Sequence, residues 1–196
     1  MAGNSKSNLK IRSVRLSDAP AILDIYNPVI GDSAITMELD SVSVADMEAR
    51  IGRVASKYPW LVATDGDKVV GYAYAGQYRE RLGYRWTVEV SVYVHPEARG
   101  RGVARQLYEK LLPLLRQMGF VKAYAVITLP HLPSTSLHEK FGFEKLAIYP
   151  DAAHKLGRWY DIGFWSLTLN PAPAVPKEPT WISELSGALK EDSCEA

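Results

Sequence analysis

The fold of this chain is decided by residues 86–104, which read WTVEVSVYVHPEARGRGVA. Valines alternate with polar or aromatic residues in the first half, which is the two-residue period of a strand with one buried face. Two glycines and two arginines follow at residues 99–102, and apolar residues then recur at helical spacing up to Met118. We therefore predict a strand, a glycine-rich turn and an amphipathic helix, in that order.

The turn at the start of this helix has the composition of a phosphate-binding site. The first N–H groups of a helix lack internal partners, the helix dipole adds positive potential, and glycine lets a ligand approach the backbone. The spacing matches neither G-x-x-x-x-G-K-[ST] nor an N-terminal G-x-G-x-x-G, so it does not support a Walker-type ATP loop or a dinucleotide fold. Taken alone, the turn is equally compatible with a solvated basic turn that binds nothing.

Strand and helix patterns alternate on both sides of this unit. We expect strands at residues 9–14, 60–63, 69–75, 121–128, 146–149 and 162–169. We expect helices after the caps Ser17-Asp18 and Ser43, and at residues 134–140. Pro113 lies inside the central helix and predicts a kink or an early break before Gly119. The predicted fold class is mixed α/β, with a hairpin turn at Asp65-Gly66-Asp67.

Composition fits one ordinary globular domain. The 196 residues are 47% hydrophobic and 23% charged, which is enough apolar surface for a core. The 23 basic and 22 acidic residues nearly cancel, so we expect neither nucleic acid nor a membrane as a partner. Cys194 is the one cysteine, which excludes a disulfide framework and a cysteine zinc site, and we predict no metal.

The two ends of the chain carry no membrane signal. No apolar run reaches about 18 residues and residues 1–10 are polar, so we expect a soluble, cytoplasmic protein. Prolines recur over residues 171–179 and favour extended backbone outside a sheet. We therefore predict one domain over residues 1–170 and a proline-rich C-terminal tail over 171–196, in which Trp181, Ile182 and Leu185 are apolar enough to dock on a surface.

The turn also matches [QR]-x-x-G-x-[GA], with Arg99, Gly102 and Ala104 at the specified positions. In this the chain resembles the GNAT superfamily of acetyl-CoA-dependent N-acetyltransferases. Other blocks resemble the phosphinothricin acetyltransferase family within it: WTVE at 86–89, VYV at 92–94, ITLP at 127–130, LHE at 137–139, FGF at 141–143 and KLGRWYDIGFW at 155–165. The resemblance spans about residues 10–170.

The resemblance implies a GNAT fold, a mixed and largely antiparallel sheet with helices on both faces and splayed central strands. It implies acetyl-CoA as the cosubstrate. The pantetheine arm would bind to the backbone of a strand, and the diphosphate would bind at the glycine-rich turn. The implied acetyl-CoA contacts are Val92, Tyr93, Val94, Arg99, Gly100, Arg101, Gly102, Val103, Ala104, His131 and Ser134. His131 stands where the family usually has asparagine, so the sequence does not decide whether His131 makes the same contact with the cofactor.

The resemblance further implies direct acetyl transfer, in a ternary complex, to the amino group of phosphinothricin, methionine sulfoximine or methionine sulfone. An ammonium group is protonated at pH 7, so transfer needs a base, and Glu89 lies between two valines whose walls would raise its pKa. His138 matches the family's histidine and is the second catalytic candidate, with a structural role left open. The implied acceptor contacts are Met37, Arg79, Arg81, Tyr84, Val126, Thr128 and Ile162. Arg79 and Met37 replace a lysine and a phenylalanine of phosphinothricin-selective members, so the acceptor stays open.

Other functions remain compatible with the sequence. An acetyltransferase for a peptide N-terminus, a polyamine or another amine is the nearest, although Arg79 and Arg81 would repel a polycation. A non-catalytic acyl-CoA-binding module is another, and a nucleic-acid binder is disfavoured because no wider basic stripe is present. Cys194 is a poor nucleophile candidate. The resemblance implies a homodimer, with the aromatic residues Trp159, Phe164 and Trp165 serving as core or subunit interface.

Overall fold

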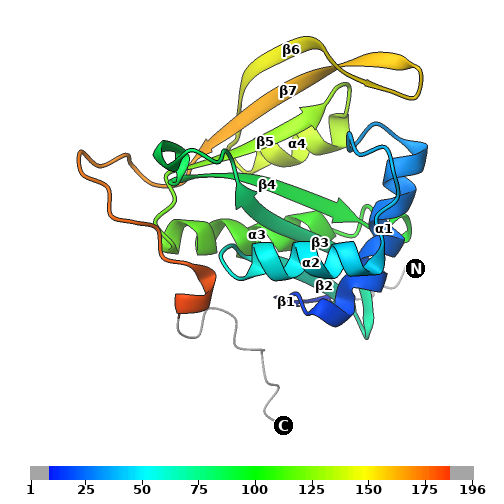
Figure 1. The fold of residues 1–196 in the computed structure, drawn as a ribbon, viewed down its shortest axis with the longest axis horizontal. Helices are drawn as coiled ribbons and strands as arrows, with labels where there is room; N and C mark the ends of the chain where they lie inside the picture. The colour runs from blue at the N-terminus through cyan, green and yellow to red at the C-terminus, as the bar shows by residue number, and fades with distance from the viewer. Residues whose placement is uncertain (1–8, 186–196) are drawn as a thin grey trace, which may run out of the picture.

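The computed structural model describes residues 9–185, in which the strands form one mixed sheet with helices on both faces (Figure 1). Within these residues the strand order is β1-β2-β3-β4-β5-β7-β6. The strands are β1 (Leu9–Ser13), β2 (Trp60–Asp65), β3 (Lys68–Gln77), β4 (Thr87–Val94), β5 (Lys122–Thr128), β6 (Glu144–Lys155) and β7 (Arg158–Thr168). Neighbours run antiparallel apart from β4 and β5, which are parallel. The predicted mixed, largely antiparallel sheet is confirmed.

Each face of the sheet has its own helices and its own core. The helices are α1 (Ala19–Asp32), α2 (Val44–Ala55), α3 (Val103–Gln117) and α4 (Leu132–Lys140). One core cluster joins α3 to the face that carries Val88 and Val90, and Leu137 of α4 packs against it. A second cluster joins α1 and α2 to the opposite face, which carries Tyr72. A ligand that enters the sheet from one face therefore meets different chemistry from a ligand that enters from the other.

The predicted starts of the first two helices are confirmed, but one of the two predicted capping hydrogen bonds is absent. Ser43 caps α2, because its Oγ accepts a hydrogen bond of 3.1 Å from the Asp46 N–H. Asp18 stands before α1 but makes no side-chain cap to that helix. Its carboxylate instead accepts 2.7 Å hydrogen bonds from the Arg12 guanidinium and the Arg15 N–H.

The expected early break at Pro113 is wrong, because α3 runs unbroken through it to Gln117. Proline removes one helical N–H and so frees the carbonyl of Glu109. Both residues are exposed, so water can satisfy that carbonyl. The neighbouring residues Leu111, Leu112 and Leu114 are buried, and their packing holds the helix together at the proline.

The last two strands are longer than predicted and form a hairpin at one end of the sheet. The sequence pattern indicated residues 146–149 and 162–169, whereas β6 and β7 cover 144–155 and 158–168. Most of β6 is exposed and its register shifts between Tyr149 and Ala153, so no regular alternation marks it. Trp165 is 3% exposed and belongs to the core, whereas Trp159 is 61% exposed.

We expect opposite effects from the same substitution at two glycines. A Cβ at Gly163 of β7 would lie 2.4 Å from the Trp165 ring, whereas a Cβ at Gly52 of α2 would meet nothing within 4 Å. Gly163→Ala should lower the free energy of unfolding by about 1–3 kcal/mol. Gly52→Ala should raise it by about 0.5–1 kcal/mol, because alanine suits a helix interior. Urea unfolding checks both, and equal signs would contradict the packing described.

Candidate active site

The parallel strands β4 and β5 separate after a short paired stretch. Residues 87–89 pair with residues 122–124, and beyond this point no register pair joins the two strands within the described chain. Figure 1 shows β4 and β5 diverging toward their C-terminal ends. Backbone N–H and C=O groups along the separated edges are left without partners from the neighbouring strand, so they can bind an extended ligand. The predicted splay of the central strands is confirmed.

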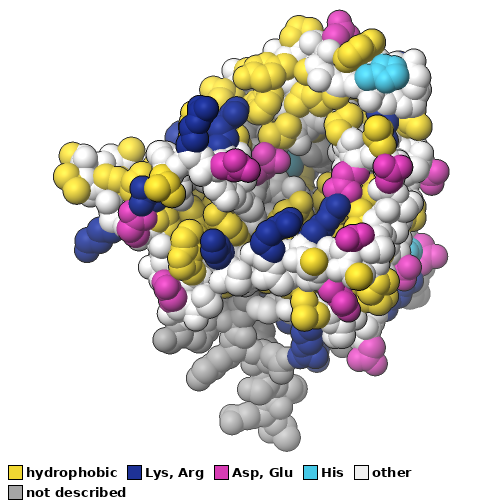
Figure 2. All heavy atoms as spheres, viewed as in Figure 1, with side chains coloured by type: hydrophobic (Ala, Val, Ile, Leu, Met, Phe, Trp, Pro, Cys, Tyr) yellow, Lys and Arg dark blue, Asp and Glu magenta, His cyan; other side chains and the backbone are white. Residues whose placement is uncertain are grey.

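The separated strands border a cavity of about 580 Å³ that passes through the sheet. Residues 90–94 and 125–128 form its two walls. Val29 and Ile35 line it from the side of α1, whereas Val103 and Leu137 line it from the side of α3 and α4. In the space-filling view the molecule is hollowed between the β6–β7 hairpin and α2 (Figure 2). Two ligands can therefore approach the same opening from opposite faces.

The glycine-rich turn has the backbone geometry that an anion requires. Gly100 and Gly102 have φ values of +75° and +79°, in the left-handed region that favours glycine. A Cβ at either would meet nothing within 4 Å, so the backbone conformation and not crowding demands glycine there. Gly102 caps α3 without a side-chain bond, and the first helical bond runs from the Gln106 N–H to the Gly102 carbonyl. The N–H groups of residues 103–105 therefore have no helical acceptor and are available to an anion.

All of the predicted acetyl-CoA contacts line this cavity apart from Arg101. The lining members are Val92, Tyr93, Val94, Arg99, Gly100, Gly102, Val103, Ala104, His131 and Ser134. Arg101 instead forms an ion pair of 2.6 Å with Asp65 at the β2–β3 turn. Arg105, which sequence reasoning missed, lines the cavity and pairs with Glu109 at 2.7 Å. Among residues 9–185, Arg99 has no ion-pair partner, so its charge is available to a ligand.

His131 caps α4 and keeps one ring nitrogen as a donor. Its Nδ1 accepts a hydrogen bond of 3.1 Å from the Ser134 N–H. Burial lowers the pKa of His131, so the ring is neutral at pH 7 and its proton lies on Nε2. His131 lines the cavity, and Nε2–H is therefore a candidate donor to a ligand.

His138 lies on the α3 side of the cavity and uses both ring nitrogens. The ring is 3% exposed, and its Nδ1–H donates to the Ser134 carbonyl at 2.8 Å. Its Nε2 accepts a 2.9 Å hydrogen bond from the hydroxyl of Tyr108, which is fully buried in α3. Burial lowers the pKa of His138 and raises that of Tyr108, so both groups are neutral. Sequence reasoning missed Tyr108, whose position beside Leu107 on the buried face of the helix was the available signal.

Glu89 lies where β4 and β5 begin to part. It pairs with Tyr124 of β5 and with Gly76 of β3, and Val90 after it is the first β4 residue to line the cavity. Gly76 has no side chain, which leaves room beside the carboxylate. Among the described residues Glu89 has no ion-pair partner, and burial raises its pKa. A carboxylate in such a place is suited to accept a proton near neutral pH.

An aromatic and cationic group lies next to Glu89. The ring of Tyr78 lies 4.7 Å from that of Tyr124, the residue opposite Glu89, and 6.0 Å from that of Tyr84. The Arg79 guanidinium lies 5.0 Å above the Tyr78 ring and 5.9 Å from the Tyr84 ring. The structure thus gathers two predicted acceptor residues, Arg79 and Tyr84, around Tyr78, whose ring contacts the residue opposite Glu89. Sequence reasoning missed Tyr78 and Tyr124.

Some of the remaining predicted acceptor residues line the cavity and others do not. Val126 and Thr128 line the cavity, and Ile162 of β7 pairs with Thr128. Because side chains alternate along a strand, Val126 and Thr128 share the face of Tyr124, and hence of Glu89. Arg81 is exposed and has no ion-pair partner within residues 9–185.

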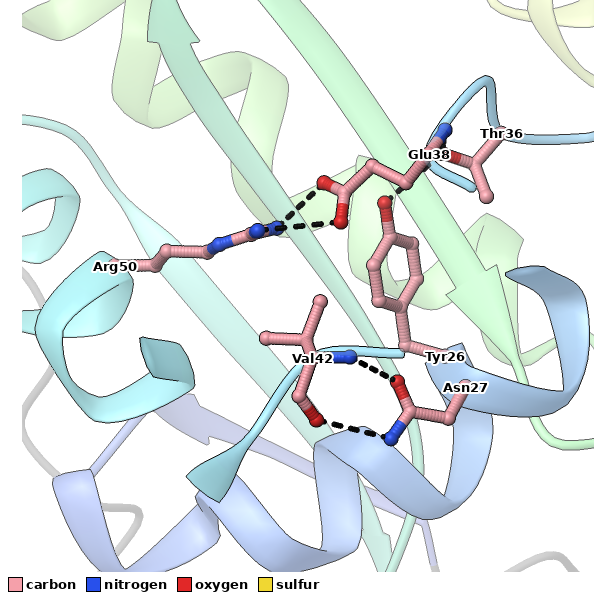
Figure 3. A network of polar contacts seen from close by, with 6 residues as sticks. All are labelled: Tyr26, Asn27, Thr36, Glu38, Val42 and Arg50. Carbon is pink, nitrogen blue, oxygen red and sulfur yellow. Dashed lines mark hydrogen bonds and ion pairs between the residues drawn. The ribbon is translucent and has the colours of Figure 1, made fainter. Parts of the chain in front are cut away.

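Met37 belongs to the loop between α1 and α2, which a polar network holds. The network consists of Tyr26, Asn27, Thr36, Glu38, Val42 and Arg50 (Figure 3). The Glu38 carboxylate receives two bonds from the Arg50 guanidinium, at 2.5 and 3.1 Å, and so ties the loop to α2. Lys155 at the end of β6 is buried and donates to the Thr36 carbonyl at 2.7 Å. The loop is therefore fixed from two sides.

The described residues lack a metal-binding group and a membrane-spanning helix. Residues 9–185 contain no group of three or more His, Cys, Asp or Glu placed to hold a metal ion. They also contain no helix that is long and apolar enough to cross a bilayer. Cys194 lies outside the described residues.

Residues 11–163 match the description of an acetyltransferase (GNAT) domain. The chain belongs to the GNAT acetyltransferase family. A phosphinothricin N-acetyltransferase of Streptomyces viridochromogenes is 36% identical to it over 172 residues, which are 87% of this chain and 94% of that protein. A methionine sulfoximine/methionine sulfone acetyltransferase of Pseudomonas aeruginosa is 37% identical over 168 residues, 85% of this chain and 98% of that protein.

A solved structure supports the same assignment for this GNAT acetyltransferase. The phosphinothricin acetyltransferase of Sinorhizobium meliloti in complex with acetyl-CoA superposes with a TM-score of 0.83. Its sequence is 33% identical, and the match covers 90% of this chain and 97% of the other. The protein is therefore an N-acetyltransferase by family, and its fold is the one on which that relative binds acetyl-CoA.

We expect Gly102→Ala to weaken acetyl-CoA binding by about ten-fold, because a residue with a side chain is strained in the left-handed region and displaces the first N–H groups of α3. Isothermal titration calorimetry measures the affinity. Gly157→Ala is the matched control, since Gly157 has φ of +76° and open space around it but lies at the β6–β7 turn. Equal losses of affinity in the two variants would argue against a phosphate role for the turn.

We expect Tyr108→Phe to raise the pKa of His138. In the wild type the Tyr108 hydroxyl donates to Nε2 and stabilises the neutral ring, and phenylalanine cannot make this hydrogen bond. The free energy of unfolding should fall by about 1 kcal/mol, since the buried Nε2 loses its partner. Nitrogen-detected NMR of the imidazole reports both the pKa and the tautomer. Tyr149→Phe, at an exposed tyrosine of β6, serves as the control. A His138 titration identical to that of the wild type would contradict the hydrogen bond.

Proposed function

We propose that this protein transfers the acetyl group of acetyl-CoA directly to the amino group of a small amino-acid-like acceptor, of the methionine sulfoximine, methionine sulfone or phosphinothricin type. The observation that carries the proposal is the opening through the sheet, together with Glu89, a carboxylate without an ion-pair partner in the described chain that lies in the last β4–β5 pair before the cavity lining begins at Val90. One face offers backbone donors for a diphosphate, and the other carries Glu89 and Tyr124, whose ring contacts the Tyr78 ring that Arg79 and Tyr84 approach. The activities for which the relatives from Streptomyces and Pseudomonas are named support the acceptor class.

The cofactor side of this proposal rests on the start of α3 and on the separated edge of β4. The free N–H groups at residues 103–105 bind the diphosphate, and Arg99 adds a cation that no carboxylate of the described chain neutralises. The backbone of residues 92–94 binds the pantetheine amides as a neighbouring strand would. Nε2–H of His131 donates a further hydrogen bond to this arm.

In the proposed reaction Glu89 accepts one proton from the acceptor ammonium, directly or through a water molecule. The freed amine then attacks the thioester carbon, so a C–N bond forms while the C–S bond breaks. Backbone N–H groups of β4 stabilise the negative charge on the acetyl oxygen. The thiolate leaves with the remaining amine proton, and no acyl-enzyme forms. His138 stays a candidate for relaying that proton, although its hydrogen bonds to Tyr108 and Ser134 equally suit a role in holding α4 against α3.

The acceptor side suits a zwitterion that carries an additional anionic or polar group. Arg79 and Arg81 attract a carboxylate and repel a polyamine. Glu38 of the α1–α2 loop is neutralised by Arg50, and Glu80 lies between the two arginines in the sequence, so the 79–81 segment carries a net positive charge. Arg79 and Met37 differ from phosphinothricin-selective relatives, so we propose that sulfoximine and sulfone acceptors are used at least as well as phosphinothricin.

We also propose that the protein forms a homodimer. Several large apolar residues are exposed on the β6–β7 hairpin, namely Leu146, Ile148, Tyr149, Leu156 and Trp159. A cluster of this kind on an edge strand favours an interface between subunits. Sedimentation of the purified protein tests it, and a monomer at assay concentrations would remove the dimer from the proposal.

An acceptor panel tests the function as a whole. Release of free thiol from acetyl-CoA is followed with methionine sulfoximine, methionine sulfone, phosphinothricin, a polyamine and a peptide with a free N-terminus. Saturable turnover confined to the first three supports the proposal. Turnover with the peptide or polyamine would support the wider acetyltransferase reading, and acetyl-CoA binding without turnover would support a non-catalytic acyl-CoA-binding module.

We expect Glu89→Gln to lower kcat by about 10²-fold or more, because the amide cannot accept the ammonium proton. In the wild type kcat/KM should fall as pH drops through the raised pKa of Glu89, and this limb should be absent from the variant. Acetyl-CoA affinity should not change. Glu144→Gln, at an exposed glutamate of β6, is the control. A pH–rate profile that the variant shares with the wild type would remove Glu89 as the base.

The same substitution has a signature in stability. The pKa of Glu89 is higher in the folded chain than in the unfolded one, so ionisation opposes folding as pH rises through the folded pKa. Glu89→Gln should therefore be more stable than the wild type at neutral pH and equally stable at a pH below the ordinary glutamate pKa.

A further inference from the structure

The chain continues past the sheet and returns along it. We call residues 177–185 the C-terminal strap, which contains the short 3-10 helix η4 (Ile182–Glu184). After β7 this part of the chain loops outward and comes back toward α3, where its last described turn lies (Figure 1). The strap donates backbone hydrogen bonds from Thr180 to the Met118 carbonyl at 2.9 Å and from Ile182 to the Lys57 carbonyl at 3.1 Å. The strap is therefore bound to the domain at two separate places.

Apolar and aromatic contacts anchor the far end of the strap. The Trp181 ring lies edge-on to the Tyr58 ring at 5.7 Å, and Lys57 Nζ lies 5.6 Å from the Trp181 ring centre. Trp181, Ile182 and Leu185 are half-buried against the α3 core, so they dock as their composition suggested. This end of the strap holds its position without help from the active site.

The near end of the strap contacts the segment that leads into β4. The Trp86 indole N–H donates to the Lys177 carbonyl at 2.7 Å. Glu178 forms an ion pair with Arg85, whose guanidinium lies 5.0 Å from the Trp86 ring centre. Arg85 Nε also donates to the Leu82 carbonyl at 2.8 Å. One guanidinium therefore joins the strap to the turn that begins at Leu82.

That turn presents part of the acceptor side. It is the 3-10 helix η2 (Leu82–Tyr84), and the Tyr84 ring faces Tyr78 and Arg79. Leu82 is 70% exposed and Tyr84 is 41% exposed, so burial contributes little to ordering the turn. Its position depends on tethers, and Arg85 is held by the strap on one side and bonded to the turn on the other.

We propose that the C-terminal strap positions the acceptor loop, residues 78–86, for the acceptor. Glu178 and the Lys177 carbonyl act through Arg85 and Trp86 on the turn that carries Tyr84. This rests on the acceptor site proposed above. The strap lies outside residues 11–163, which match the acetyltransferase domain. Glu178 is a positioning residue, because it reaches the acceptor only through Arg85.

A strap that only stabilised the fold would have different effects when its contacts are removed. Loss of stability alone would lower the melting temperature and would affect both substrates alike. Positioning of the acceptor loop changes the KM of one substrate, since the start of α3 and residues 90–94 do not contact the strap. The ratio between the two KM values therefore separates the roles.

The test uses the full-length double variant Trp86→Phe, Glu178→Gln. Phenylalanine keeps a ring beneath Arg85 but lacks the indole N–H, and glutamine removes the carboxylate charge. The contacts of Trp181 with Tyr58 stay in place, so the strap remains docked at its far end. Glu48→Gln, at an exposed glutamate of α2, is the charge-matched control. The single variants Glu178→Gln and Arg85→Gln, together with the variant that combines them, form a double-mutant cycle with the wild type.

We expect the double variant to raise the acceptor KM about five-fold and to leave the acetyl-CoA KM, kcat and melting temperature at control values. Hydrogen exchange measured by mass spectrometry should be faster over residues 78–86 and unchanged over α3. In the Arg85→Gln background, Glu178→Gln should add no further effect.

An unchanged acceptor KM with unchanged exchange over residues 78–86 would overturn the proposal. Equal rises in both KM values, or additive effects in the cycle, would do so as well. If the wild type turns over no acceptor of the panel, the proposed function fails on its own account. Exchange over residues 78–86 then decides the strap separately, because protection equal to that of the wild type in the double variant refutes it.

Discussion

Parallel hydrogen bonding between β4 and β5 ends at Glu89 and Tyr124, and the rest of the site depends on that limit. If the pairing continued, residues 90–94 and 125–128 would satisfy one another's backbone groups and the sheet would be closed. Because it stops, the edges face a cavity that reaches both sides of the sheet. Buried backbone groups require partners, so the opening favours an extended ligand that supplies them.

The two sides of the opening differ in how they handle charge. The α3 side relies on backbone N–H groups and a single cation at Arg99, with the histidines next to it kept neutral by burial. On the other side Glu89 has no ion-pair partner among the described residues, and the Arg79 guanidinium lies over the Tyr78 ring. An ion pair would lower the pKa of the carboxylate, whereas burial without one raises it. The raised pKa of Glu89 therefore reflects burial that no ion-pair partner among the described residues offsets.

Hydrogen bonds and ion pairs hold the two loops of the proposed acceptor side, the α1–α2 loop and residues 78–86, in place although parts of them are exposed. The α1–α2 loop is bound by Arg50 from α2 and by Lys155 from the end of β6. The 78–86 loop is bound through Arg85 and Trp86 to a strap that lies outside the matched domain. Each tether joins residues far apart in the chain, so the geometry of the acceptor side reflects the whole fold and not one segment.

The sequence by itself determined the strand, the turn and the helix over residues 86–118, because periodicity and glycine conformation are local properties. It also placed Glu89 between buried valines of a strand and Gly102 at a helix start, and resemblance indicated the family. Local pattern misled at Pro113, where packing of neighbouring leucines preserves the helix, and along β6, where an exposed edge strand lacks alternation. Only the tertiary structure decided where β4 and β5 part, that Tyr108 donates to His138, and that Glu178 reaches Arg85. These contacts join distant segments, and their register and packing are set by the folded chain as a whole.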